Sequence, residues 1–329
     1  MRCSGYLFAH SAGEALSLLA ELDGAGRVIA GGTDLMLAPG EAASATLVDI
    51  SQIQELRYIE QRGERLHVGS LCTHEDLATS PLLHERAAAL AAAAAAVGSP
   101  QIRSVGTVGG NVMNALPAAD TAIALAALGA TADVLGPGGT RETDLLTLYA
   151  GVGRSTVDPA REILTGFSFR IPRGSSFQRL AKRKALALPV LNAAAALWDD
   201  GEGGARTEVG IAVGPVATTP WRATEAERLV RGHAPTRELI EQAARTAMTT
   251  AVCRDSIRSC ALYRQFMVEV LVRRALLEAT GLAPTGREAA GPGTRSSAVR
   301  GRAHRAAPGR TDGGAFDQDA PASRRGGDR

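Results

Sequence analysis

The sequence predicts an α+β fold in three parts: a two-lobed N-terminal region over residues 1–174, a small C-terminal domain over 175–281, and a disordered tail over 282–329. Three observations predict it. Short apolar runs alternate with helical segments in the first part, three strand-like segments precede two helical ones in the second, and the last part has almost no large apolar side chains. A chain of 329 residues is long enough for a core in each folded part.

The first lobe, about residues 1–56, begins with a helix. The string Ser11-Ala12-Gly13-Glu14 has the spacing of a capping box and precedes several leucines, so we expect an amphipathic helix that ends near Asp23. Gly24 and Gly26 then break it. Two apolar runs, 27–30 and 46–50, predict two buried strands, with a glycine loop after the first.

The second lobe, about residues 57–174, begins with a hairpin and continues with helices. Alternating residues in 57–60 and 66–69 flank Arg62-Gly63-Glu64, which predicts two paired strands. Helices are expected next over 73–79 and over the alanine-rich segment 81–97, which Gly98 ends. The later segments are then expected to be a helix over 121–127 and two strands over 131–135 and 162–171.

Beyond Gly174 the pattern becomes that of a separate α+β domain. We expect three antiparallel strands over 176–181, 190–198 and 208–214, followed by helices over 236–249 and 255–280. In the last helix Leu262, Phe266 and Val270 fall on one face, and Gly281 ends it.

The tail is predicted to be disordered because Val299 and Phe316 are its only large apolar residues after Ala283, too few to offset the entropy of ordering. It holds nine arginines and five acidic residues from Gly281 onward, whereas the whole chain has a formal net charge of +2. Aromatic side chains that could stack on bases are nearly absent from it, so we expect no nucleic-acid partner.

Several kinds of site are excluded by spacing. The cysteines form no CxxC pair and the six histidines do not cluster with acids, so no metal site is expected. Gly24-Ala25-Gly26 begins a GxGxxG pattern, but Ile29 stands at its last position and a strand follows, which excludes a Rossmann motif. The longest apolar stretch, 87–97, is far shorter than the roughly 20 residues of a membrane span, and we expect a cytoplasmic protein without one.

Two glycine segments, each expected to form a loop, carry the functional signal: Ala30-Gly31-Gly32-Thr33-Asp34 and Thr107-Val108-Gly109-Gly110-Asn111. Glycines expose backbone N–H groups that no Cβ obstructs, as a bound phosphate or pyrophosphate requires. Either segment alone could be a simple turn. Together they favour a dinucleotide cofactor.

These strings, with Leu35 after the first and Pro117 and Asp120 after the second, resemble the two FAD-binding motifs of the flavoprotein (medium) subunits of molybdenum hydroxylases. This family includes the FAD parts of xanthine dehydrogenase and aerobic carbon monoxide dehydrogenase. The resemblance continues through segments 98–103, 162–165, 183–187 and 255–264, and it covers about residues 4–280.

The resemblance implies FAD as the cofactor and a vanillyl-alcohol-oxidase-like, PCMH-type domain of two lobes. It also implies the cofactor contacts. In the first segment these are Ile29, Ala30, Gly31, Gly32, Thr33, Asp34, Leu35 and Met36, and in the second Thr107, Val108, Gly109, Gly110 and Asn111. Asp34 is expected to orient its loop, because a carboxylate repels phosphate. Asp120 would accept from a ribose hydroxyl or cap a helix, and Leu164 would pack near the isoalloxazine.

One departure from the family concerns a lysine that several relatives carry close to the flavin, in a segment matching Phe177-Gln178-Arg179. No lysine occurs at these three positions. Either Arg179 substitutes for it, or Lys182 reaches in from the same strand. A cation beside the N1–C2=O edge of the flavin would raise the flavin potential.

The function implied is that of an electron-transfer subunit without catalytic acid, base or nucleophile of its own. The expected partners are a molybdopterin-binding large subunit and a [2Fe-2S] small subunit in a hetero-oligomer, a dimer of heterotrimers. The expected electron acceptor is NAD+, a quinone or oxygen. Two alternatives remain open: a stand-alone FAD oxidoreductase of the same superfamily, and a cofactor-free interaction subunit.

Overall fold

The computed structural model describes residues 3–37, 45–183, 185–200 and 206–282. The predicted tail therefore lies outside the described residues, apart from Leu282. Within the described ranges no helix has the length and apolarity needed to cross a membrane.

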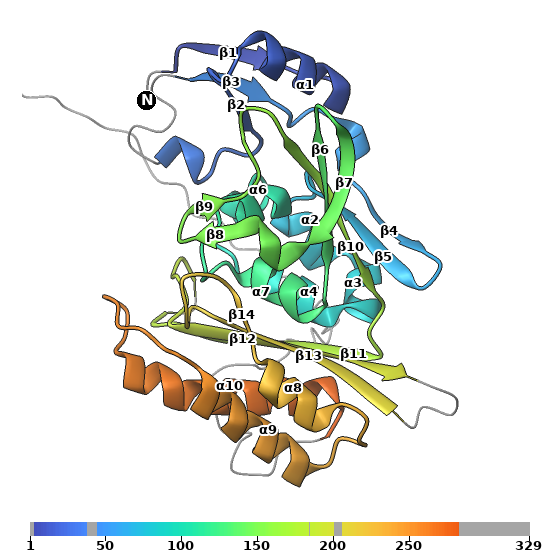
Figure 1. The fold of residues 1–329 in the computed structure, drawn as a ribbon, viewed down its shortest axis with the longest axis vertical. Helices are drawn as coiled ribbons and strands as arrows, with labels where there is room; N and C mark the ends of the chain where they lie inside the picture. The colour runs from blue at the N-terminus through green and yellow to red at the C-terminus, as the bar shows by residue number, and fades with distance from the viewer. Residues whose placement is uncertain (1–2, 38–44, 184, 201–205, 283–329) are drawn as a thin grey trace, which may run out of the picture. The chain divides into compact units, whose positions relative to one another are not determined.

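The first lobe is a three-stranded parallel sheet with one helix (Figure 1). Its elements are β1 (Gly5–Phe8), α1 (Ala12–Glu21), β2 (Gly26–Ile29), the 3-10 helix η1 (Leu35–Leu37) and β3 (Thr46–Asp49), and the strand order is β1-β3-β2. Ser11 is the N-cap as predicted, since its hydroxyl accepts from the backbone N–H of Glu14, but the reciprocal bond of a capping box differs: the Glu14 carboxylate accepts from the N–H of His10 and not of Ser11. Strand β1 was not predicted, because most of its side chains are exposed and give no burial signal.

The second lobe contains a five-stranded antiparallel sheet in the order β4-β5-β10-β6-β7. The strands are β4 (Ile59–Arg62), β5 (Arg65–Gly69), β6 (Thr131–Gly136), β7 (Gly139–Asp144) and β10 (Ile163–Arg170). Its helices are α2 (His74–Thr79), α3 (Pro81–Arg86), α4 (Ala88–Ala95), α5 (Pro100–Arg103), α6 (Val108–Met113) and α7 (Asp120–Ala127). Short elements η2 (Gln54–Leu56), η3 (Leu145–Leu148), β8 (Tyr149–Gly151) and β9 (Arg154–Ser155) complete it.

Two expectations about these helices are wrong. The segment 81–97 is not one helix, because Ala87 leaves the helical conformation (φ −151°, ψ 55°) and separates α3 from α4. The N–H of Ala89 then donates to Ser175 Oγ, 3.1 Å away, so a distant strand completes the start of α4. The second glycine segment is not a loop, since Gly109 and Gly110 lie in the first turn of α6.

The C-terminal part is an antiparallel sheet in the order β11-β12-β13-β14, with three helices. The strands are β11 (Gly174–Leu180), β12 (Leu191–Asp200), β13 (Arg206–Gly214) and β14 (Trp221–Arg222). The helices are α8 (Thr224–Val230), α9 (Arg237–Thr250) and α10 (Ala261–Ala279). The three longer strands correspond to the predicted ones, whereas the short β14 and α8 were not predicted.

The last helix differs from its prediction in two respects. It begins at Ala261 and not at Asp255, because residues 254–260 form a loop whose backbone bonds the buried side chain of Arg264. Its predicted face is also largely exposed: Leu262 is 63% and Phe266 57% accessible. The face that packs on the sheet comprises Val268, Leu271, Val272, Ala275 and Leu276.

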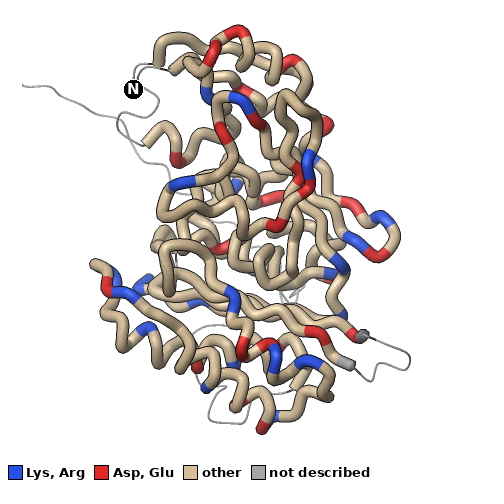
Figure 2. Tube along the Cα trace, in the orientation of Figure 1, with Lys and Arg blue, Asp and Glu red and all other residues tan. Residues whose placement is uncertain are grey.

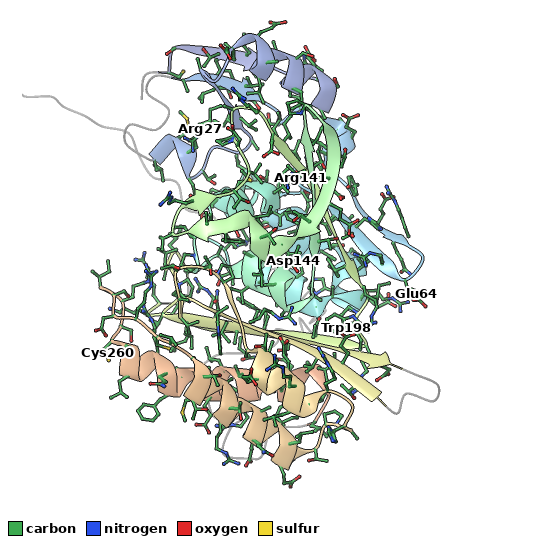
Figure 3. All side chains as sticks on the ribbon, viewed as in Figure 1. Arg27, Glu64, Arg141, Asp144, Trp198 and Cys260 are labelled. Atoms are coloured by element: carbon green, nitrogen blue, oxygen red, sulfur yellow. The ribbon has the colours of Figure 1, made fainter. Side chains whose placement is uncertain are left out.

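The C-terminal sheet has helices on both faces. Helices α8 and α10 contact one face and α9 packs on both of them, and the apolar side chains of the three helices share a core with β12 and β13. Helices α4 and α7 lie between the other face and the five-stranded sheet, in the largest core cluster (Figure 1). Trp198 marks the edge of this junction (Figure 3); its indole N–H donates to the carbonyl of Arg170, 3.0 Å away.

Charged residues of both signs are interspersed along the described trace (Figure 2). Many are paired across the surface, as in Arg57 with Asp76 at 2.8 Å and Arg141 with Glu162 at 3.0 Å. Exposed pairs of this kind contribute little to stability, about 0–1 kcal/mol each. The fold therefore rests mainly on its apolar cores.

Candidate functional site

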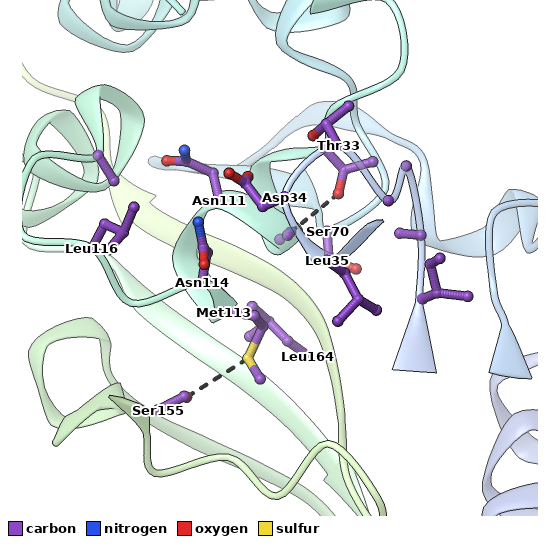
Figure 4. A pocket seen from close by; sticks show the side chains of 18 of the residues that line it. Thr33, Asp34, Leu35, Ser70, Asn111, Met113, Asn114, Leu116, Ser155 and Leu164 are labelled. Carbon is purple, nitrogen blue, oxygen red and sulfur yellow. Dashed lines mark hydrogen bonds between the residues drawn. The ribbon is translucent and has the colours of Figure 1, made fainter. Parts of the chain in front are cut away.

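A cavity of about 630 Å³ lies where the two glycine segments meet (Figure 4). Its wall includes the end of β2, the start of α6, the segment 153–164 and parts of the C-terminal sheet region. Of the predicted contacts it brings together Ile29, Ala30, Gly31, Gly32, Thr33, Asp34, Leu35, Thr107, Gly109, Gly110, Asn111, Asp120, Leu164 and Arg179.

Three predicted contacts do not line this cavity. Met36 is 46% exposed in η1, and Val108 is fully buried on the core side of α6. Lys182 is exposed and follows the end of β11 at Leu180, so it does not belong to the same strand as Arg179. Arg179 alone of the two candidate cations reaches the cavity wall.

The first glycine segment is shaped by close contact with the residues directly before the second. An ideal Cβ at Gly31 would lie 2.0 Å from the carbonyl oxygen of Val105, and only glycine fits there. Gly32 has φ +65°, a conformation that side chains with a Cβ rarely adopt. Partial burial raises the pKa of the neighbouring Asp34 carboxyl above its ordinary value.

The second glycine segment forms the start of α6. Thr107 is its N-cap, and the Thr107 hydroxyl accepts from the N–H of Gly110 at 3.1 Å. A Cβ at Gly109 would lie 2.7 Å from the Ser70 backbone oxygen, whereas one at Gly110 would meet only the Thr107 hydroxyl within 4 Å. Gly110 is exposed and lines the cavity. Its missing side chain therefore keeps cavity space open.

Residues 70–74 form backbone hydrogen bonds with this segment and with Gly106 before it. Backbone hydrogen bonds of 2.9 Å join Gly109 N to Ser70 O, Val108 N to Cys72 O, and His74 N to Gly106 O. Ser70 Oγ and His74 Nδ1 line the same cavity region and are buried without a hydrogen-bond partner in the described structure. Burial first, then the charge of Arg103, lowers the pKa of His74 to about 4. Neither Ser70 nor His74 was predicted from the sequence, because no motif includes them.

The asparagines of α6 add polar groups to the wall (Figure 4). Asn111 and Asn114 are three residues apart, so they lie on one face of the helix. The Thr121 hydroxyl donates to Asn111 Oδ1 at 2.7 Å, which orients this amide and leaves its NH₂ group as the end available to a ligand. Nearby, Ser155 Oγ lies 3.8 Å from Met113 Sδ.

Asp120 and Arg179 form an ion pair in the cavity wall. Arg179 Nε lies 3.2 Å from both Asp120 carboxylate oxygens. The Arg179 side chain is 13% exposed and that of Asp120 6%. Asn192 Nδ2 donates to Asp120 Oδ1 at 2.7 Å. Burial raises the pKa of Asp120 to about 6, although Arg179 and Asn192 act against this. The alternative prediction that Asp120 caps a helix is wrong, because the N-cap of α7 is Ala119 and Asp120 is the first helical residue.

The arrangement suits an elongated ligand with phosphate and hydroxyl groups. Glycines, hydroxyl and amide residues and a carboxylate all line one cavity, although the N–H groups of Val108, Gly109 and Gly110 already donate to acceptors within the protein. No group of three or more His, Cys, Asp or Glu residues that could hold a metal ion occurs in the described part of the chain.

Comparison with known proteins gives two family matches. The model described as the FAD binding domain in molybdopterin dehydrogenase matches residues 2–174, and that of the CO dehydrogenase flavoprotein C-terminal domain matches residues 176–279.

Individual proteins are similar over most of this chain. The nicotinate dehydrogenase FAD-subunit of Eubacterium barkeri is 31% identical, over 76% of this chain and 87% of its own. The carbon monoxide dehydrogenase medium chain of Hydrogenophaga pseudoflava is 29% identical, over 81% and 93%. The solved structure of reconstituted CO dehydrogenase from Oligotropha carboxidovorans superposes with a TM-score of 0.78 at 28% identity, over 86% of this chain and 100% of that one.

Proposed function

The chain belongs to the FAD-binding subunits of the molybdopterin dehydrogenases, and we propose that its cavity holds FAD between the two glycine segments and passes electrons from iron–sulfur clusters to an external acceptor. Its cofactor is FAD, and it is a subunit of an oxidoreductase complex. The single observation that carries the site is the convergence of both glycine segments on one cavity.

The residues present fit this cofactor. Gly110 leaves open space where a larger residue would fill the cavity, and Ser70 Oγ and His74 Nδ1 are polar atoms beside it that have no hydrogen-bond partner among the described residues. We assign the pyrophosphate to the backbone of the first glycine segment and to the hydroxyls of Thr33 and Thr107, because the N–H groups of Val108, Gly109 and Gly110 already donate within the protein. Bound FAD supplies the redox chemistry, and these residues bind and orient it.

The remaining roles follow from position in the cavity wall. Asp120 accepts a hydrogen bond from a ribose hydroxyl, and Leu164, 5% exposed, packs against the isoalloxazine. Arg179 is the cation next to the ring, in place of the lysine of several relatives. Lys182 has no role in this assignment, because it does not line the cavity.

We propose the domain boundaries 1–174, with PCMH-type lobes over about 1–56 and 57–174, and 175–281 for the C-terminal domain. The two family matches, over 2–174 and 176–279, support this division. We also propose a cytoplasmic complex with a molybdopterin-binding large subunit and a [2Fe-2S] small subunit, assembled as a dimer of heterotrimers. Relatives named medium chains support such partners. The acceptor is NAD+, a quinone or oxygen.

Gly110→Val tests the site. A valine at Gly110 has room within the protein apart from the Thr107 hydroxyl, but it occupies the cavity, so the fold should survive and FAD should be lost. The matched control is Gly13→Val, also in the first turn of a helix and open on all sides, but outside the cavity wall. Flavin absorbance per protein and circular dichroism are measured for both. Full flavin occupancy in Gly110→Val would refute the assignment.

Co-expression with neighbouring genes separates the proposed complex from the alternatives. The complex predicts co-purification with molybdenum and iron–sulfur subunits, and no substrate turnover by the isolated chain. Turnover by the isolated chain would indicate a stand-alone oxidoreductase. Purification without flavin, with the partners present, would indicate an interaction subunit.

A further inference from the structure

Asn192 lies outside the cavity lining and connects the C-terminal sheet to it. It belongs to β12, is fully buried, and donates from Nδ2 to Asp120 Oδ1 at 2.7 Å and to the carbonyl of Ala118 at 3.4 Å. Asp120 and Ala118 precede or begin α7 in the N-terminal region. A single amide of one domain thus holds the start of a helix in the other.

The Asp120 carboxylate depends on these contacts because it is almost completely removed from water. A buried carboxylate stays ionised only where hydrogen bonds and opposite charge replace the lost hydration. Arg179 supplies opposite charge and a hydrogen bond, and Asn192 supplies a further hydrogen bond. The two residues belong to β11 and β12 of the C-terminal sheet. Arg179 is itself held in place, since it also donates to the carbonyl of Ala187.

Close packing keeps this arrangement in register. A Cβ at Gly214, the residue paired with Asn192 across β12 and β13, would lie 2.2 Å from the carbonyl oxygen of Pro117. The turn before α7 therefore packs directly on the end of β13, beside Asn192 of β12. This contact limits how far Asp120 can move away from Asn192.

We propose that Asn192 is a positioning residue of the cofactor site: together with Arg179 it keeps the Asp120 carboxylate ionised and aimed at the cavity, so that the C-terminal domain sets the charge offered to the ligand. The inference rests on the proposed function, since it concerns how tightly this cavity retains FAD. An ionised carboxylate is a stronger acceptor for a hydroxyl than a protonated one. FAD retention should therefore weaken when Asp120 is protonated.

The pH dependence follows from the groups that face Asp120. In the described structure these are Arg179 from β11, Asn192 from β12 and the backbone around Ala118, with Asp120 itself on α7. The pKa of Asp120 is raised to about 6 by burial against the opposing effect of Arg179 and Asn192. Removing the Asn192 donor should raise this pKa further, and the pH at which FAD affinity is half lost should rise with it.

The experiment measures the FAD dissociation constant of the full-length chain by flavin fluorescence over a pH series that brackets 6. Asn192→Ala should weaken FAD binding about tenfold near neutral pH. It should also raise the pH at which FAD affinity is half lost, called the half-loss pH, by about one unit. Asn192→Asp keeps the side-chain volume, replaces the donor by a second acid, and should move the half-loss at least as far. It also covers the case in which the alanine variant fails to fold.

Ser175→Ala is the matched control. Ser175 makes another hydrogen bond between the domains, from Ala89 N at 3.1 Å, but it does not touch Asp120 or line the cavity. A general weakening of the domain junction would affect all variants alike and leave the half-loss pH unchanged. The inference is overturned if both Asn192 variants keep the wild-type half-loss pH. If wild type binds no FAD at any pH, the proposed function fails and the inference falls with it.

Discussion

Gly31 and Val105 are in direct contact: the carbonyl oxygen of Val105 occupies the place where any Cβ on Gly31 would lie, 2.0 Å from its ideal position. The two residues are far apart in sequence and belong to different lobes. Gly106, next to Val105, in turn lies against Thr33, whose hydroxyl is 3.3 Å from the ideal Cβ position of Gly106. The first glycine segment therefore packs directly against residues 105 and 106, which lead into the second, and this contact brings the two segments to one cavity.

Gly31→Ala should disturb this contact more than its small size suggests. The added methyl group cannot coexist with the Val105 carbonyl, so backbone has to shift, at a cost of about 1–3 kcal/mol. FAD occupancy should fall as well, since the cradle opens. Urea unfolding and flavin absorbance measure the two effects. The control is Gly13→Ala in α1, where open space and helix propensity predict unchanged or higher stability. Equal stability of Gly31→Ala and wild type would contradict this reading.

The exposed face of α10 gives a prediction about stability. Phe266 is 57% exposed, so Phe266→Ala should change the free energy of unfolding by less than about 0.5 kcal/mol. Leu271 is 2% exposed and part of the C-terminal core, so Leu271→Ala should lower the free energy of unfolding by about 2–5 kcal/mol. Denaturant unfolding of the two variants compares them directly. Similar losses would show that the Phe266 face is covered in the folded chain.

This helix also shows where sequence analysis stops. Apolar residues occur on more than one face of α10, and periodicity cannot tell which face meets the sheet. The same holds for α4, whose alanine-rich sequence is buried on nearly all sides and gave no sign of the break at Ala87. These choices depend on tertiary contacts such as that of Ser175 with Ala89, which no local pattern encodes.

For the site, adjacent glycines followed by hydroxyl and amide residues indicated a place for a phosphate, and the resemblance to the FAD-binding motifs supplied the individual contacts. Most of those contacts line one cavity. Ser70, His74 and Asn192 were missed because they act through burial and through partners more than thirty residues away. Their role exists only once the chain is folded.

Arg264 is a buried cation whose removal should be costly. It is 1% exposed and donates to the carbonyls of Val190 and Arg254 and to Ser256 Oγ. Arg264→Met leaves these acceptors unpaired and should lower the free energy of unfolding by about 3 kcal/mol. Lysine should restore little, because it lacks the planar set of donors.

Urea unfolding measures this loss, and Arg245→Met is the control. Arg245 is exposed and lies 3.9 Å from Glu241 in a surface pair, so its replacement should cost less than about 0.5 kcal/mol. A lysine variant at position 264 with wild-type stability would show that charge alone, without geometry, satisfies the site.

His74 should make the folded chain sensitive to acid. Its pKa in the folded state is lowered to about 4 from an ordinary value of 6.5, because burial and Arg103 disfavour the charged ring. Between these two pH values the unfolded chain binds a proton that the folded chain does not, so stability falls as pH decreases from 6.5 towards 4. The full effect is roughly 3 kcal/mol. This loss of unfolding free energy is absent above pH 6.5 and complete below about pH 4.

His74→Gln should remove this dependence, since glutamine does not titrate. Asp120 acts in the opposite direction over part of the same range, because its raised pKa favours the folded state as pH falls through about 6. The difference in stability between the variant and wild type at each pH gives the contribution of His74. Unfolding midpoints measured at several pH values provide this difference. His84→Gln, on the exposed side of α3, should keep the wild-type slope. If His74→Gln also keeps the wild-type slope, the ring at position 74 is charged or solvated in the folded chain. Its burial beside the cavity is then disproved.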